Sequence, residues 1–178
     1  GVRLVGSEMC IRDSYNLKTK EKKLVKEQEI PSGHNTDDYI VERLECSSHD
    51  GRLIPITITR HKKTKIDGSA NLLLYGYGSY GNSMSPDFSS TRLSLINRDI
   101  IWVTAHIRGG MERGMKWWKE GKLLNKKNTF KDFISVAKNL IERNYTSKGK
   151  IIGMGGSAGG LLMLSLIHIS EPTRRTPI

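Results

Sequence analysis

A serine framed by glycines is the residue in this sequence whose surroundings best suit chemistry. Residues 155–159 read Gly-Gly-Ser-Ala-Gly and fit the pattern G-x-S-x-G, in which Ser157 stands at a sharp turn from a strand into a helix. Glycines two residues to either side suit such a turn, because larger side chains would collide there. The pattern predicts an exposed hydroxyl nucleophile, with the backbone N–H of Ala158 at the helix start placed to hold an oxyanion.

The same glycines admit a second interpretation. Gly153, Gly155 and Ala158 match the looser dinucleotide-binding pattern G-x-G-x-x-G/A, and glycine-rich turns are common in α/β folds that carry out no chemistry. A dinucleotide turn normally follows the first strand of its unit and has an acidic residue about 20 positions later. Here the turn follows several strand-like runs, so its position favours the nucleophile turn.

Short apolar runs before Ser157 predict the sheet that must hold it. Residues 38–46 alternate apolar and polar side chains, residues 53–59 form a second strand candidate, and Asp50-Gly51 between them is a hairpin signal. Three later runs are typical of buried parallel strands: residues 72–75, residues 100–105 and the run that begins at Ile151. The order of strands, loops and helices predicts an α/β sheet.

Two helices are expected between these strands. Residues 89–96 are suited to a short helix, and Asn128-Thr129 is expected to cap a longer amphipathic one. The apolar face of the longer helix is predicted to contain Phe130, Phe133, Ile134, Ala137, Leu140 and Ile141. Trp117 and Trp118 are expected to belong to the core rather than to a site.

Composition excludes few classes of protein. The 178 residues carry a formal net charge of +11, with 37% hydrophobic and 26% charged residues, and no stretch reaches membrane-spanning length. The basic residues lie in scattered lysine-rich patches with acids mixed in and little aromatic interleaving, which predicts neither a nucleic-acid nor a membrane partner. A basic nucleic-acid-binding module remains the non-enzymatic alternative.

The two ends of the sequence are predicted to be foreign to the protein. Residues 4–14 can be encoded by a DNA segment whose reverse complement encodes residues 164–173 and the start of the next codon. That segment resembles a transposon adapter used to prepare sequencing libraries, so residues 1–14 and 164–178 are set aside from fold reasoning. Cys46 is then the only native cysteine, which fits a reducing, cytoplasmic compartment.

Four motifs in a fixed order connect the chain to a known family. They are residues 74–81 (LYGYGSYG), 106–110 (HIRGG), 121–130 (GKLLNKKNTF) and 155–162 (GGSAGGLL). With them, residues 15–163 resemble the prolyl oligopeptidase family of serine peptidases, and within it the oligopeptidase B group. The resemblance implies an incomplete α/β-hydrolase domain at residues 37–163, preceded at residues 15–36 by the end of a β-propeller and a linker.

The resemblance also implies roles for individual residues. Ser157 is expected to be the nucleophile, and Tyr77 to donate its phenol hydroxyl to the oxyanion beside the Ala158 N–H. Tyr80 would stand at the rim of the primary pocket. Asp87 would match one of an acidic pair that receives basic side chains, and Ser85 occupies the position of the other.

The implied activity is hydrolysis of short peptides after basic residues, through an acyl-enzyme and without metal or cofactor. Another α/β-hydrolase, an esterase or an aminoacyl peptidase, is the alternative enzyme, and the oligomeric state stays open. A serine needs a base, and in these folds the order is Ser, Asp or Glu, His, so the partners are expected beyond Met163. His168 is expected to lie on the same helix as Ser157 and to point away. The four earlier histidines are expected to be structural or surface residues: His34, His49, His61 and His106.

Overall fold

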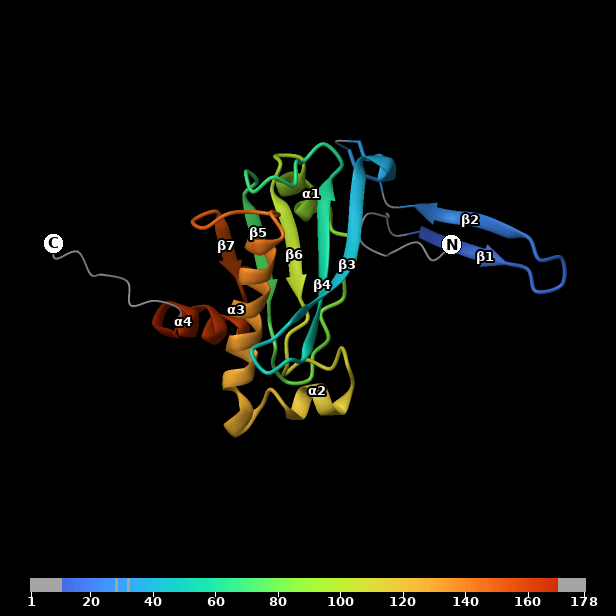
Figure 1. Ribbon diagram of the computed structural model, residues 1–178. Coiled ribbons are helices and arrows are strands. Elements are labelled where there is room, and N and C mark those ends of the chain that lie inside the picture. Colours follow the sequence, from blue (N-terminus) through green and yellow to red (C-terminus); the bar gives the residue numbers. More distant parts are fainter. Residues whose placement is uncertain (1–10, 28, 32, 170–178) are drawn as a thin grey trace.

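The computed structural model describes residues 11–27, 29–31 and 33–169, and its main element is a five-stranded sheet (Figure 1). The strand order is β3-β4-β6-β5-β7, in which β3, β4 and β6 pair antiparallel while β6, β5 and β7 pair parallel. The strands are β3 (Tyr39–Ser47), β4 (Leu53–His61), β5 (Leu72–Gly76), β6 (Ile101–Ala105) and β7 (Ile151–Met154). The predicted α/β class is confirmed.

The expected hairpin joins β3 to β4. Its register pairs Tyr39 with His61 at one end and Ser47 with Leu53 at the other. Gly51 turns the chain with φ of +78°, and its N–H donates to the Ser48 carbonyl over 3.0 Å. Both strands extend one or two residues beyond the predicted runs, because their backbones continue to pair after the apolar pattern ends.

Across the described residues, four α-helices and two 3-10 turns precede, connect or follow the strands of the sheet. The helices are α1 (Ser90–Ile96), α2 (Met115–Lys119), α3 (Lys127–Glu142) and α4 (Ala158–Ile169), and the turns are η1 (Thr36–Asp38) and η2 (Leu123–Asn125). The short helix α2 was not predicted, although its Trp117 is buried as expected. In the described part of the chain, no helix combines the length and the apolar character needed to cross a membrane.

Neighbouring residues of β5 and β6 show that helices cover both faces of the sheet. A Cβ atom on Gly76 would come within 2.8 Å of Phe133 on α3, so Gly76 faces that helix. Tyr75 points to the opposite face. There it stacks on Trp102, with ring centroids 6.2 Å apart, and the guanidinium of Arg92 on α1 lies 4.6 Å from the Trp102 ring. The core therefore has two layers of helix around one sheet.

The start of α3 differs from the prediction. Asn128 and Thr129 do not cap the helix, which begins at Lys127 without a side-chain cap. Thr129 instead lies buried in the first turn and donates to the Arg108 carbonyl over 2.8 Å. Asn128 donates to the Glu120 carbonyl over 3.0 Å. Both polar side chains thus satisfy loop carbonyls rather than the end of their own helix.

The buried face of α3 is also rotated from the expected one. Phe130, Phe133 and Leu140 are buried as predicted, but Ile134, Ala137 and Ile141 are only half-buried. The remaining buried positions are Thr129, Asp132 and Val136. Side chains three or four residues apart share a helix face, and here that face includes two polar residues because they have partners in the loops below.

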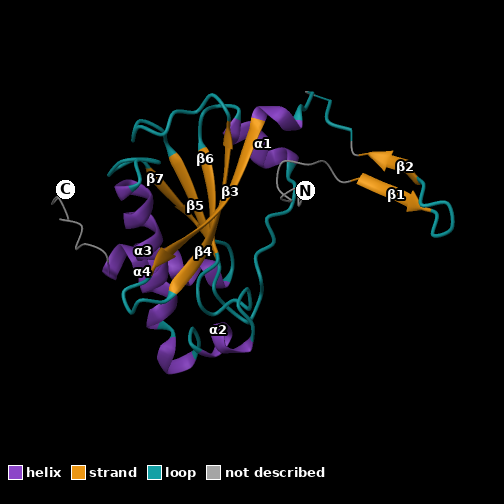
Figure 2. Ribbon diagram, turned by 45° about the vertical axis from the view of Figure 1, so that its right-hand side comes forward, coloured by secondary structure: helices purple, strands orange, loops and turns teal. Residues whose placement is uncertain are grey.

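A separate antiparallel hairpin precedes the sheet. It pairs β1 (Ile11–Tyr15) with β2 (Lys22–Glu27) and extends away from the rest of the chain (Figure 2). Lys22 forms an ion pair with Asp13 across it, with Nζ and Oδ2 2.6 Å apart. The strand β1 crosses the predicted boundary at residue 14. The β-propeller assignment of residues 15–36 stays a prediction.

Candidate active site

Three parallel strands end at one edge of the sheet. The register pairs Tyr75 with Met154 and Gly76 with Ala105, so β5, β6 and β7 finish side by side. The loops that follow them therefore emerge together at residues 77–81, 106–110 and 155–157. Sites in open α/β sheets form at such carboxyl-terminal strand ends.

The chain turns sharply from β7 into α4 at Ser157. Ser157 has φ of +53° and is exposed, and few residues with a side chain adopt that left-handed backbone. A Cβ on Gly155 would come within 2.5 Å of the Gly159 carbonyl oxygen, and one on Gly159 within 2.9 Å of the Gly76 carbonyl oxygen. The crowding expected at these two glycines is therefore present, and the strained turn lifts Ser157 to the surface.

The first turn of α4 begins directly after the serine. Ala158 is the first helical residue, where backbone N–H groups have no acceptor inside the helix. The next two N–H groups are used locally: Gly159 donates to the Gly156 carbonyl and Gly160 to the Ser157 carbonyl, each over 2.8 Å. A group with negative charge near Ser157 would meet the positive end of this helix.

Tyr77 packs against the same turn. A Cβ on Gly159 would lie 3.6 Å from Tyr77 Cδ2 and 3.7 Å from its Cα, so the half-buried Tyr77 rests on the first turn of α4. Tyr80 lies at the tip of the same loop with φ of +57° and 76% of its surface exposed. The structure thus brings Tyr77, Ala158 and Ser157 into one neighbourhood.

The described hydrogen bonds of Asp87 are with Ser85 and Arg92, not with residues around Ser157. It is exposed in the segment before α1, and its Oδ1 accepts a hydrogen bond from Ser85 Oγ over 2.6 Å. Its backbone carbonyl accepts one from Arg92 over 3.1 Å. Ser85, which occupies the second position of the expected acidic pair, therefore forms a hydrogen bond with the Asp87 carboxylate.

The Tyr77 loop rests on the 106–110 loop. Gly78 has φ of +62°, and a Cβ there would lie 2.8 Å from Ile107 and 3.0 Å from the Arg108 carbonyl oxygen. Gly81 donates its N–H to the Gly109 carbonyl over 3.0 Å. Movement of the lower loop would therefore displace the loop that carries Tyr77.

A buried arginine fixes the lower loop. Arg108 is 1% exposed and donates to both carboxylate oxygens of Asp132, from Nε over 2.8 Å and from Nη2 over 2.6 Å. It also donates to both oxygens of Asp50, over 2.6 and 3.1 Å. Burial opposes its charge, but the hydrogen bonds to Asp132 and Asp50 outweigh that penalty and raise the pKa of the guanidinium. Arg108 joins α3, the β3–β4 hairpin and the loop after β6.

Comparison with known proteins decides the family. The model of the prolyl oligopeptidase family matches residues 86–174, which include the Ser157 turn. The chain belongs to the prolyl oligopeptidase family. The sheet is part of an α/β-hydrolase fold, as predicted. The match extends past residue 163, and the foreign origin of residues 164–178 stays a prediction.

Relatives in this family match nearly the whole chain. A dipeptidyl aminopeptidase BI from Pseudoxanthomonas mexicana is 47% identical over 149 residues, which cover 83% of this chain and 20% of that protein. A protease 2 from Moraxella lacunata is 43% identical, over 87% of this chain and 22% of that protein. Among solved structures, oligopeptidase B from Trypanosoma brucei with covalently bound antipain has a TM-score of 0.86 and 32% identity, over 93% of this chain and 24% of that one. The chain therefore spans about a fifth of the length of its relatives.

Sequence reasoning missed the Arg108 cluster. The motif at residues 106–110 and the Asp50-Gly51 turn were both noticed, but neither pattern shows that Arg108 and Asp50 touch. One signal was present: Asp132 lies between Phe130 and Phe133 on the buried side of a helix, where an acid is rare without a partner. The buried position of Asp132 predicts a cationic partner, but it does not indicate which Lys or Arg residue that partner is.

The earlier histidines have partners away from Ser157. His106 is buried and shares a hydrogen bond with Thr57 Oγ1 over 2.8 Å, while His49 contacts Ser48 Oγ over 3.0 Å. The other two pack on Tyr39: His34 stacks on its ring, and His61 meets it edge-on. His168 lies on α4 as expected, but its side chain is outside the described residues. Among the described side chains, none supplies a base in hydrogen-bond contact with Ser157 Oγ.

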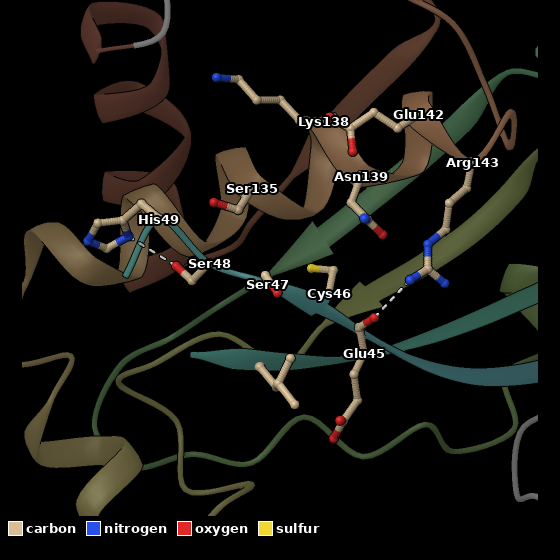
Figure 3. Close-up of a pocket in the computed structure, with 11 residues that line it drawn as sticks. Glu45, Cys46, Ser47, Ser48, His49, Ser135, Lys138, Asn139, Glu142 and Arg143 are labelled. Atoms are coloured by element: carbon tan, nitrogen blue, oxygen red, sulfur yellow. Dashed lines mark hydrogen bonds between the residues drawn. The ribbon is translucent and has the colours of Figure 1, made fainter. Parts of the chain in front are cut away.

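A cavity lies between β3 and α3, away from these loops (Figure 3). It measures about 510 Å³, and its wall includes Cys46, Ser135 and Asn139. Cys46 is 2% exposed, and burial raises the pKa of its thiol to about 11, so the sulfur is protonated at neutral pH. Within the described residues, no three His, Cys, Asp or Glu side chains converge as metal ligands would. Among the described residues, the Cys46 thiol is therefore neither an ionised nucleophile nor part of a metal-ligand cluster.

Proposed function

We propose that this chain carries the nucleophile and oxyanion-binding parts of a serine oligopeptidase. Ser157 Oγ attacks the carbonyl carbon of a short peptide, the amine leaves, and water then hydrolyses the acyl-enzyme. The supporting observation is the strained backbone of Ser157 between β7 and α4, with Tyr77 packed on the same turn. Membership of the prolyl oligopeptidase family agrees with this chemistry.

The proposed oxyanion site uses one side chain and one backbone group. During attack the carbonyl oxygen gains negative charge, which the Tyr77 hydroxyl and the Ala158 N–H would stabilise. Removing one such donor typically costs about 2.7–4 kcal/mol of transition-state stabilisation. Proton transfer from Ser157 needs a base, for which we propose the Asp and His expected beyond Met163.

We propose peptides with basic residues as the substrate class, with Tyr80 at the rim of the primary pocket. The exposed carboxylate of Asp87 would receive a basic side chain in a neighbouring subsite. The name oligopeptidase B of the Trypanosoma relative supports cleavage of short peptides. An upstream β-propeller, whose end and linker would be residues 15–36, would limit substrate size. A cytoplasmic location also remains a proposal, resting on the single native cysteine.

The name of one relative favours a second candidate function. Because the Pseudoxanthomonas relative is a dipeptidyl aminopeptidase, the same nucleophile could release dipeptides from free amino termini. Chromogenic arginyl peptides with blocked and with free amino termini separate the two activities. Hydrolysis of the blocked peptide indicates the endopeptidase, whereas hydrolysis of the free one alone indicates the aminopeptidase.

The test uses the full-length protein, a fluorophosphonate probe and an arginyl chromogenic peptide. Ser157→Ala is expected to abolish both labelling and hydrolysis while leaving folding intact, because the hydroxyl acts only in attack. Ser94→Ala, at an exposed position of α1, is the matched control and should retain both. Activity that survives in Ser157→Ala, or steeply salt-dependent DNA affinity without hydrolysis, would contradict the proposal.

A further inference from the structure

We propose that Lys126 is a positioning residue for catalysis, because it holds the loop that presents Tyr77. This inference rests on the proposed function, in which Tyr77 donates to the oxyanion. Lys126 stands between η2 and α3, far along the chain from the loop it contacts. Its role would be to fix the backbone next to the phenol, without touching the substrate.

The ammonium group of Lys126 makes both of its described hydrogen bonds to this loop. Nζ donates to the Gly78 carbonyl oxygen over 2.5 Å and to Ser79 Oγ over 2.9 Å. Gly78 directly follows Tyr77 in the chain, so its carbonyl is one peptide unit from the residue that would bind the oxyanion. Charge-assisted bonds of this length are short and strong.

The loop needs such support because its backbone is unusual. Gly78, Tyr80 and Gly81 all have positive φ, at +62°, +57° and +69°. Tyr80 has a side chain, so its left-handed conformation carries a strain that the surroundings must hold in place. Tyr77 at the start of the loop packs on Gly159 of α4, and Lys126 binds the next two residues of the loop.

Lys126 keeps its charge in an unfavourable place. It is half-buried, and burial lowers the pKa of its ammonium group. In the part of the chain that the structure describes, no carboxylate pairs with it to offset that cost. Its neighbour Lys127 is exposed and has no such contact with the loop. Apart from the Phe130 ring, whose centroid lies 6.0 Å from Nζ, the described partners of the ammonium group are on this one loop. We therefore assign Lys126 to the support of that loop.

The expected kinetic signature follows from the position of Tyr77. The oxyanion forms only on the way to the transition state, so misplacing its donor lowers kcat and leaves KM nearly unchanged. Small displacements of a catalytic group cost about 10- to 100-fold in rate. We therefore expect Lys126→Met to reduce kcat of the full-length protein by that factor, with KM within about two-fold.

The experiment is a double-mutant cycle in the full-length protein with an arginyl chromogenic peptide. The variants are Lys126→Met, Tyr77→Phe and their combination, with Lys127→Met as matched control and Lys126→Arg as conservative rescue. If Lys126 acts through Tyr77, adding Lys126→Met to the Tyr77→Phe variant should lower kcat by less than about a further two-fold. Lys126→Arg should recover part of the rate, and Lys127→Met should match wild type.

Each outcome supports or overturns the proposal. A rise in KM alone, an equal loss of kcat with and without the Tyr77 hydroxyl, or an unaffected Lys126→Met would each overturn it. If Lys126→Met does not fold, Ser79→Ala removes one of the two contacts and should still lower kcat without changing KM; no change would count against the proposal. Failure of the proposed function itself appears differently, as hydrolysis that survives Ser157→Ala, and then both proposals are wrong.

Discussion

Asp132 accepts three hydrogen bonds from a single residue, Arg108. Two come from the guanidinium, over 2.8 and 2.6 Å, and the third comes from the Arg108 backbone N–H over 3.0 Å. Asp132 is completely buried, so these bonds fix helix α3 to the loop after β6 in one arrangement. The Tyr77 loop rests on that loop, and the pair therefore supports the proposed oxyanion site from below.

Removal of the Asp132 carboxylate should destabilise this region strongly. Asp132→Ala leaves the buried charge of Arg108 with Asp50 alone, and breaking a buried ion pair costs roughly 3–5 kcal/mol. We expect faster hydrogen–deuterium exchange in α3, residues 127–142, of the full-length protein, together with a lower kcat. Asp37→Asn, at an exposed position, is the control and should leave exchange unchanged. Wild-type exchange in Asp132→Ala would contradict the structural role.

Acid should weaken the same cluster through Asp50. The hydrogen bonds from Arg108 lower the pKa of Asp50 below its ordinary 3.8. A lowered pKa contributes stability above the unfolded-state value, and that contribution is lost as pH falls through the lower folded-state value. Thermal unfolding of the full-length protein should therefore show a loss of stability below about pH 4 that is smaller in Asp50→Asn. An identical acid dependence in the variant would argue against this contribution.

Tyr77→Phe tests the proposed oxyanion donor directly. The substitution removes one hydroxyl and little volume, so kcat should fall by about 10²- to 10³-fold while KM stays nearly constant. Steady-state kinetics with an arginyl peptide measure both constants. A raised KM with normal kcat would instead place Tyr77 in substrate binding.

Cys46 should be unreactive in the folded protein. Burial raises its pKa from 9.0 to about 11, so little thiolate is present at pH 8. Folded protein should react slowly with iodoacetamide at Cys46, and denatured protein rapidly, as peptide mass spectrometry can measure. Because the pKa is raised, this group stabilises the fold fully below pH 9 and loses that contribution as pH rises toward 11. Rapid labelling of the native thiol would show that the β3–α3 cavity opens.

The 178-residue chain by itself should be inactive. No described side chain provides a base for Ser157, and β7 is an edge strand with Ile152 and Met154 about half exposed, at 50% and 46%. Exposed edge strands promote aggregation. Expression of the chain followed by thermal unfolding and an arginyl peptide assay checks both points. A cooperative transition with turnover that Ser157→Ala eliminates would refute this expectation.

The sequence by itself determined the features that depend on near neighbours in the chain. The turn at Ser157 needs glycines two residues away, and the strand β5 is a continuous apolar run followed at once by its loop. The hairpin turn at Gly51 is equally local. Such features follow from backbone sterics and side-chain periodicity within a few residues, so patterns along the chain were enough to place them and to suggest the family.

Tertiary structure decided which distant residues hold these features in place. Lys126 reaches Gly78 across 48 positions, and Arg108 reaches Asp50 across 58. Thr129 looked like a helix cap but satisfies a loop carbonyl instead. The local sequence pattern does not predict these partners. Buried charges and polar groups form hydrogen bonds with the groups that the packing of sheet and helices brings within about 3 Å.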